Sequence, residues 1–143
     1  MKQKIKIEKV NKAHFKSISS LLHNYMSRFL PNPAQIDAIW QEYIGQSNVH
    51  AVVLIHESSV IGFGSVMIET KIRGGRMGHI EDIVIDEKYQ LRGYGDLLIN
   101  NLVEIACSLG CYKISLQCKH DKIEFYEKCG FARSGTAMQL FLT

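Results

Sequence analysis

The sequence has little net charge and no long hydrophobic run. Its 143 residues carry a formal charge of +3 at pH 7. Because Lys and Arg are spread along the chain, nucleic acid is not expected as a partner. No stretch approaches the roughly 18 uninterrupted apolar residues that a membrane helix needs, and the first ten residues alternate charge with isoleucine instead of forming the apolar core of a signal peptide. We therefore expect a soluble cytoplasmic protein with no membrane span.

The cysteine and histidine spacings fit no metal site. Four cysteines are separated by three, six and ten residues, which matches no zinc-ligand pairing, and the six histidines are dispersed. We interpret the cysteines as buried thiols and expect no metal ion. The hydrophobic content of 46% and the charged content of 22% suit a single domain over 1–143.

Hydrophobic periodicity in the first half predicts a strand, two helices and three further strands. Alternation over 3–10 is typical of a half-buried strand. Behind Asn11, a candidate N-cap, apolar residues at helical spacing predict a helix, and a second helix begins at Pro33 and closes at Gly45. Three β-rich runs separated by turns follow, at 49–55, 60–69 and 79–85.

The second half continues as helix, strand, helix and strand. An apolar stripe over 98–109 predicts an amphipathic helix. A strand over 112–118, a helix capped by Asp121 and closed by Gly130, and a final strand over 131–142 complete the chain. The expected fold class is mixed α/β, with a mostly antiparallel central sheet flanked by about four helices in the order β-α-α-β-β-β-α-β-α-β.

Two glycines stand at the mouth of the helix predicted over 98–109, in the stretch YQLRGYG. A helix start presents N–H groups without intrahelical acceptors and a partial positive charge, so an anion is stabilised there. With no Cβ at Gly93 and Gly95 a phosphate can come close, and Gln90 and Arg92 can add donors at the rim. The stretch fits neither G-x-G-x-x-G nor a P-loop. For isolated glycines, a tight turn between strand and helix is the alternative interpretation.

The glycines belong to a larger pattern, [QR]-x-x-G-x-[GA], at residues 90–95. This pattern resembles the acetyl-coenzyme A binding motif of the GNAT superfamily of N-acetyltransferases, and the expected order of elements agrees with that superfamily over nearly the whole chain. Three segments, GHIEDIVIDEKYQLRGYGDLLI, GCYKISLQC and FYEKCGF, cover most of 78–131. They resemble the members that acetylate glucosamine 6-phosphate.

The resemblance implies acetyl-coenzyme A as co-substrate and a place for it on the chain. Backbone groups of Ile83, Val84 and Ile85 would bind the pantetheine arm like an added strand. A carboxylate at Asp96, where relatives often carry a non-acidic residue, also suits the first turn of a helix. The loop expected to surround the pyrophosphate consists of Gln90, Leu91, Arg92, Gly93, Tyr94, Gly95 and Asp96.

The resemblance also implies how the acetyl group moves. A neutral amine attacks the thioester carbonyl directly, so a proton must leave the amine, and Glu81 is the expected proton acceptor. Tyr126 would donate a hydrogen bond to the departing thiolate, and the N–H near Val84 would stabilise the oxyanion. Without the resemblance, Glu81 and Asp82 would be solvated strand carboxylates and Tyr126 a packing aromatic.

An amino-sugar phosphate is the expected acceptor, because the relatives with the closest segments use it. Its site would consist of Lys71, Glu81, Asp82, Tyr112, Lys113 and Gln117, although each lysine alone is more often a solvated surface residue. The chain ends in MQLFLT and lacks the basic residue with which family members reach the phosphate bound to a neighbouring subunit. The arginines that could replace it are Arg28, Arg73 and Arg76.

The apolar closing stretch AMQLFL suggests an edge that a second copy covers, so a homodimer is expected. Two alternatives stay open. One is a GNAT enzyme that acetylates another small amine or a protein amino group. The other is a coenzyme A binding module that has lost catalysis.

Overall fold

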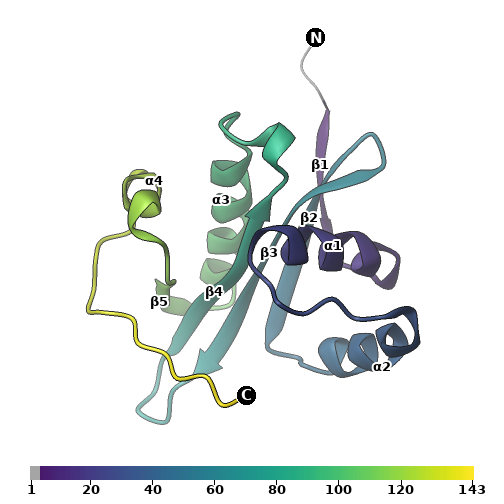
Figure 1. Cartoon of the computed structure of the whole chain (residues 1–143). Coiled ribbons are helices and arrows are strands. Elements are labelled where there is room, and N and C mark those ends of the chain that lie inside the picture. The colour runs from purple at the N-terminus through teal and green to yellow at the C-terminus, as the bar shows by residue number, and fades with distance from the viewer. Residues whose placement is uncertain (1–3) are drawn as a thin grey trace.

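A computed structural model describes residues 4–143 and contains one five-stranded sheet in the order β1-β2-β3-β4-β5 (Figure 1). Neighbouring strands are antiparallel except β4 and β5, which are parallel. The strands are β1 (Ile5–Lys9), β2 (Val49–His56), β3 (Ser59–Thr70), β4 (Arg76–Ile85) and β5 (Cys111–Ser115). The α-helices are α1 (Phe15–Tyr25), α2 (Pro33–Ile44), α3 (Tyr94–Ser108) and α4 (Ile123–Lys128). Short 3-10 turns lie at Lys12–His14, Glu87–Tyr89 and His120–Lys122.

The mixed α/β fold class and the predicted order of elements are confirmed as far as α4. The Asn11 side chain accepts a hydrogen bond from the Ala13 N–H at 2.9 Å and so caps the turn that leads into α1. Pro33 is the first residue of α2, and Gly45 is its C-cap. No helix among the described residues is long and apolar enough to cross a membrane.

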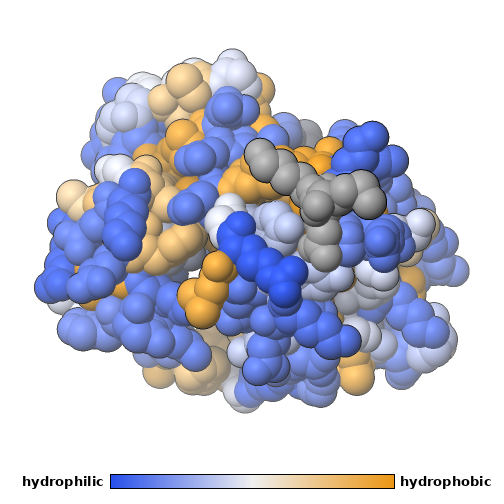
Figure 2. Space-filling view, turned by 90° about the horizontal axis from the view of Figure 1, so that it is seen from above, coloured by the Kyte–Doolittle hydropathy of each residue, from blue (hydrophilic) through white to orange (hydrophobic). Residues whose placement is uncertain are grey.

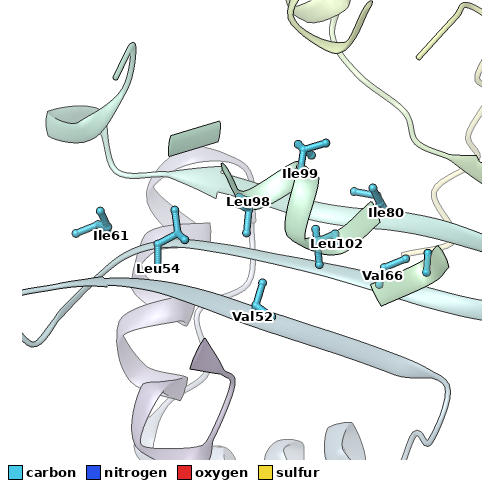
Figure 3. Close-up of a cluster of buried hydrophobic side chains, with 9 residues drawn as sticks. Val52, Leu54, Ile61, Val66, Ile80, Leu98, Ile99 and Leu102 are labelled. Atoms are coloured by element: carbon cyan, nitrogen blue, oxygen red, sulfur yellow. The ribbon is translucent and has the colours of Figure 1, made fainter. Parts of the chain in front are cut away.

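Helices cover both faces of the sheet, and each face has its own hydrophobic cluster. We call these the α3 face and the α1 face. On the α3 face, Leu98, Ile99 and Leu102 are fully buried (Figure 3). They pack against strand residues Val52, Leu54, Ile61, Val66 and Ile80. On the α1 face, Ile18 and Leu21 of α1 pack with Ala51, Val53, Phe63 and Val84.

Two irregularities in β4 shape the middle of the sheet. Phe63 pairs with Val84 and Ser65 with Glu81, so two residues of β4 oppose Gly64 alone, which is a β-bulge. A Cβ on Gly64 would lie 2.6 Å from Cδ1 of Ile83, so the bulge requires glycine there. Pairing of β4 with β5 stops at His79 and Ser115. Within residues 4–143, no strand therefore lies beside the outer edge of β4 over 80–85.

The predicted final strand is wrong. Residues 131–143 contain no strand or helix, and the segment runs down from α4 without pairing (Figure 1). A period-two pattern becomes a strand only when a neighbouring backbone supplies hydrogen bonds, and within the described chain this segment has no ladder partner. Its large apolar side chains are 71–92% exposed, namely Met138, Leu140, Phe141 and Leu142.

Two smaller predictions are also wrong. Cys107 and Cys118 are exposed and Cys111 and Cys129 are half-buried, so the four thiols are not the buried group we expected. Cys107 is exposed because it lies off the buried stripe of α3. Asp121 does not cap the last helix, because a 3-10 turn intervenes and Lys122 occupies the N-cap of α4.

Candidate active site

The site is built around the unpaired edge of β4. Alternate N–H and C=O groups of a strand point to each side, so the edge over 80–85 offers main-chain groups to a ligand. Val84 is buried, and the Ile83 and Ile85 side chains pack on the α3-face cluster, which holds the edge rigid. The Gln90 side chain donates to the Ile85 carbonyl at 3.0 Å. Gln90 therefore ties the following loop to the end of the strand, a contact that the sequence did not indicate.

The loop that follows β4 enters α3 through left-handed backbone. Leu91 has φ +62° and Gly93 has φ +82°, and Gly93 is the N-cap of α3. A bulky residue such as Leu is rare in this conformation and indicates a constrained segment. Arg92 lies over the Tyr89 ring at 5.7 Å. Seen from above, this end of the molecule is mostly hydrophilic, with separate apolar patches (Figure 2).

The two glycines of the motif serve different needs. At Gly93 a Cβ would meet no atom within 4 Å, so only its positive φ favours glycine. At Gly95 a Cβ would lie 3.0 Å from Cζ of Phe125 in α4. Gly95 therefore lets α3 and α4 approach each other, a packing role beside the phosphate contact predicted from the sequence.

Asp96 lies in the first turn of α3 and has a partner. It accepts a hydrogen bond from the Cys129 thiol at 3.4 Å. Burial, and then the neighbouring Asp96 carboxylate, raises the pKa of Cys129 to about 11. The thiol therefore stays protonated at neutral pH, and Asp96 links α3 to the end of α4.

Glu81 and Tyr126 lie on opposite faces of the sheet. Side chains alternate along a strand, so Glu81 faces away from Ile80, which belongs to the α3-face cluster. Tyr126 packs on that α3-face cluster, with its ring edge-on to Phe125 and Phe131 at centroid distances of 4.9 and 6.0 Å. A group threaded between the strands would therefore meet a carboxylate on one side and a phenol on the other.

Burial shifts the proton affinity of Tyr126. It raises the pKa of the phenol, and the nearby thiols of Cys118 and Cys129 add to the shift. The hydroxyl therefore stays protonated and can donate a hydrogen bond at neutral pH. Glu81 is exposed, and its main-chain carbonyl accepts a hydrogen bond from the Ser65 hydroxyl at 3.1 Å.

Asp82 occupies the bulge in left-handed backbone, with φ +56°. Asp82 is exposed as a residue, but the partial burial of its carboxyl group raises the pKa of that group. Tyr43 of α2 packs on the α1-face cluster, and burial and then the Asp82 carboxylate raise the pKa of its phenol. The Tyr43 hydroxyl is buried and has no hydrogen-bond partner in the part of the chain that the structure describes.

A cluster of three polar side chains lies near Glu81, and the sequence interpretation included only one of them. Lys71 contacts Glu69 at 2.9 Å, and the same Glu69 oxygen contacts Nε2 of His79 at 2.8 Å. Sequence reasoning named Lys71 but missed Glu69 and His79. The signal was available, because His79 and Glu81 are two residues apart in a predicted strand and must share a face.

The remaining acceptor residues are scattered. Tyr112 is exposed, accepts a hydrogen bond from Arg73 at 2.9 Å, and has Lys113 near its ring at 5.8 Å. Gln117 lies beyond the end of β5 and is exposed. Arg76 donates to the Leu109 carbonyl at the end of α3.

Arg28 lies in the segment between α1 and α2. Its guanidinium donates to the main-chain oxygen and the hydroxyl of Thr143, at 3.1–3.2 Å. The structure therefore gives each of the three candidate arginines a protein partner. Over residues 4–143 no group of three or more His, Cys, Asp or Glu could hold a metal ion.

Comparison with known proteins gives these features a context. Over 87 residues the chain is 39% identical to a probable glucosamine 6-phosphate N-acetyltransferase from Oryza sativa, covering 59% of this chain and 52% of that protein. Over 85 residues it is 46% identical to the glucosamine 6-phosphate N-acetyltransferase of Trypanosoma brucei, covering 58% of each chain. The matches thus span somewhat more than half the length of these curated relatives.

Similarity in three dimensions extends further along the chain. The crystal structure of glucosamine-6-phosphate N-acetyltransferase from Arabidopsis thaliana superposes with a TM-score of 0.91 at 28% identity, covering 99% of this chain and 100% of that one. An acetyltransferase structure from Trypanosoma brucei gives 0.88 at 29% identity, covering 97% and 100%. Residues 15–131 match the family described as Acetyltransferase (GNAT) family, and the chain belongs to this family.

Proposed function

We propose that this protein transfers the acetyl group of acetyl-coenzyme A to the amine of glucosamine 6-phosphate. The product, N-acetylglucosamine 6-phosphate, would feed the formation of UDP-N-acetylglucosamine in the cytoplasm. The observation that supports the proposal is the parting of β4 and β5 after His79 and Ser115, in a sheet that carries Glu81 on one face and Tyr126 on the other. The named relatives from rice and Trypanosoma brucei support this choice of acceptor.

The cofactor would lie along the free edge of β4 and end at the start of α3. Main-chain groups of 83–85 would pair with the amides of the pantetheine arm, as an added strand does. The diphosphate would sit on the N–H groups of residues 91–96, where Gly93 turns the chain and the α3 dipole favours negative charge. Supplied in this way, the thioester reaches the gap between the two strands.

The amine must lose a proton before it can attack. An alkylammonium with a pKa near 10.4 costs about 4–5 kcal/mol to deprotonate at pH 7, and Glu81 would accept that proton directly or through water. The neutral amine then attacks the carbonyl carbon with no covalent enzyme intermediate. The Val84 N–H would stabilise the oxyanion, and Tyr126 would donate to the departing sulfur.

Acceptor recognition would involve both charged and polar side chains around the gap. Asp82 and the main chain at Gln117 suit hydroxyl and amine groups, Tyr112 and Lys113 lie on β5, which borders the gap, and Lys71 directly follows β3. We propose that Arg28 binds the sugar phosphate by exchanging its contact with Thr143 for the ligand, because a guanidinium matches phosphate geometry. We also propose that the protein acts as a homodimer, in which a second copy covers the exposed tail.

An acceptor panel tests the proposed function. Release of free thiol is measured with glucosamine 6-phosphate, unphosphorylated glucosamine, a small alkylamine and a lysine-containing peptide. We expect kcat/KM to be highest for glucosamine 6-phosphate. A peptide preferred over both sugars would indicate a protein acetyltransferase, and coenzyme A binding without turnover on any acceptor would indicate a non-catalytic module.

Single substitutions separate the candidate phosphate ligands. Arg28→Ala, Arg73→Ala and Arg76→Ala are compared using the phosphorylated sugar, with unphosphorylated glucosamine as the control acceptor. A raised KM for the phosphorylated sugar alone identifies the arginine that binds phosphate. Three unchanged KM values would reject all three arginines.

A further inference from the structure

His79 is held between two partners on the same face of β4 as Glu81. Its Nε2 lies 2.8 Å from Oε1 of Glu69 on β3, and its Nδ1 lies 3.4 Å from the Ser115 hydroxyl on β5. The imidazole thus spans three strands. About a quarter of the side chain is exposed, so water can reach it.

The partners of His79 decide which nitrogen carries the proton. An ionised carboxylate only accepts hydrogen bonds, and hydrogen bonds from Lys71 and then His79 lower the pKa of Glu69. Glu69 is therefore charged at neutral pH, and Nε2 must donate to it. In the neutral ring Nδ1 then keeps its lone pair, on the side of Ser115.

The position of Nδ1 allows this lone pair to accept a proton from the site. Ser115 is the last residue of β5 and the last that pairs with β4, so Nδ1 faces the start of the gap between the strands. Glu81 is the next residue of β4 on the same face, about 7 Å further along the strand. One water molecule can bridge a carboxylate and an imidazole at such a separation.

A second proton acceptor beside Glu81 would let Glu81 receive two protons within one turnover. The attacking nitrogen gives up one proton before the N–C bond forms and another as the C–S bond breaks, but a single carboxylate holds one proton at a time. Imidazole is the side chain whose ordinary pKa suits proton exchange near neutral pH. His79, with Glu69 opposite its other nitrogen, is placed to take the first of these protons.

We propose that His79 is a proton-relay residue, oriented by Glu69, that accepts at Nδ1 the proton which Glu81 removes from the acceptor amine. This inference rests on the proposed function. The first proton passes from the ammonium to Glu81, through water to His79 and then to solvent. Glu81 is thereby free to take the second proton as the C–S bond breaks. Glu81 passes that proton to solvent, and Tyr126 regains from solvent the proton that it gives to sulfur, so each turnover releases one proton net.

The test compares His79→Gln with the wild type across pH 6 to 9.5. Glutamine can still donate to Glu69 through its amide but cannot accept a proton. We expect unchanged thermal stability, a KM for acetyl-coenzyme A within twofold of the wild type, and a kcat at pH 7 that is at least tenfold lower. The deficit should shrink as pH rises, because the amine then arrives already neutral. His23→Gln, on the exposed surface of α1, is the matched control and should leave the profile unchanged.

Two further measurements distinguish proton relay by His79 from a purely structural role. Glu69→Gln keeps an acceptor for Nε2–H but removes the charge, so we expect a smaller loss of kcat with the fold intact. Nitrogen NMR of the imidazoles at pH 8, assigned by the signals missing from His79→Gln, should show His79 protonated on Nε2 and bare on Nδ1.

Several outcomes would overturn the relay. These are a wild-type pH profile in His79→Gln, an equal deficit at every pH, or protonation on Nδ1. If His79→Gln does not fold, a wild-type profile in Glu69→Gln has the same meaning. A wild-type enzyme that releases no thiol with glucosamine 6-phosphate contradicts the proposed function itself, and the relay fails with it.

Discussion

At the scale of single residues, the site depends on groups whose surroundings fix their protonation. Tyr126 is kept protonated by burial and packed between two phenylalanines. Asp82 is held in left-handed backbone at a bulge, and burial raises its pKa. Such strained or desolvated positions gather at functional sites, since the rest of the fold must stabilise them.

Tyr126→Phe should remove the donor to the departing thiolate while leaving the ring packing in place. We expect kcat to fall about 100-fold, the scale found for loss of one donor to a developing negative charge, while the Kd for coenzyme A stays within twofold. Stopped-flow thiol release and calorimetry measure the two quantities. Because burial raises the Tyr126 pKa above its ordinary value near 10, ionisation of this phenol should cause no loss of wild-type rate below pH 10. A full rate in Tyr126→Phe would exclude it from the chemistry.

Asp82→Asn should separate stability from function. The unfolded carboxyl ionises above its ordinary pKa of 3.8, whereas the folded one holds its proton to higher pH. The folded state therefore binds more protons in that interval, and stability falls as pH rises through it. Asn also tolerates positive φ, so we expect the variant to be more stable than the wild type at pH 7 and equally stable at pH 3. Its KM for the sugar should be higher than that of the wild type. Urea unfolding at both pH values tests this, and equal stability at pH 7 would contradict it.

At the scale of elements, the bulge in β4 and the early end of β5 create the site. Gly64 on β3 leaves room for the bulged Ile83, and Asp82 occupies the bulge directly after Glu81, the last paired residue before it. The candidate site thus lies where the regular pairing of the sheet is interrupted. Its geometry should change when the bulge is altered.

Gly64→Ala should disturb this bulge from behind. The new Cβ would lie 2.6 Å from Cδ1 of Ile83 and 3.0 Å from Cδ1 of Leu102, and overpacking of this kind costs about 1–3 kcal/mol of unfolding free energy. We expect that loss together with a reduced kcat. Replacing Ile83 by Val removes its Cδ1, so Gly64→Ala/Ile83→Val should recover part of both, as read by chemical unfolding and thiol release. No recovery in the double variant would show that the contact with Ile83 is not the cause.

Periodicity and capping signals predicted most elements but not the features that make the site. Pro33, Gly45 and Asn11 mark helix ends through contacts with their chain neighbours, so these helix ends could be predicted from the sequence. The bulge opposite Gly64 and the contact of Gly95 with Phe125 depend on segments far apart in the chain, and no local pattern contains them. The sequence places His79 on the same strand face as Glu81, but its contacts with Glu69 and Ser115 are made on two other strands, and no local pattern contains them.

The tail shows the limit of local patterns most clearly. We predicted a final strand over 131–142, yet residues 131–143 have no pairing partner within the described chain. A strand's backbone hydrogen bonds belong to the pair and not to the segment. At the scale of the whole molecule, the missing partner of this tail would be a second copy of the chain.

Oligomeric state is therefore the prediction that belongs to the whole molecule. We expect sedimentation equilibrium at micromolar concentration to give twice the mass of one chain. Deletion of residues 136–143, which removes the four exposed apolar side chains of the tail, should give a monomer. Ile72→Ser, which removes an exposed apolar residue elsewhere, should remain a dimer. A monomeric wild type, or a deletion variant that still forms dimers, would reject the tail as the interface.

The account as a whole claims that the gap between β4 and β5 joins an acyl carrier on one side to an amino-sugar phosphate on the other. The most direct measurement is a crystal structure with coenzyme A and N-acetylglucosamine 6-phosphate. It should show the diphosphate on the N–H groups of residues 91–96, the sulfur within hydrogen-bond distance of the Tyr126 hydroxyl, and the acetamido nitrogen facing Glu81. Coenzyme A bound away from the β4 edge, or a sugar phosphate on the side of Tyr126, would contradict the account.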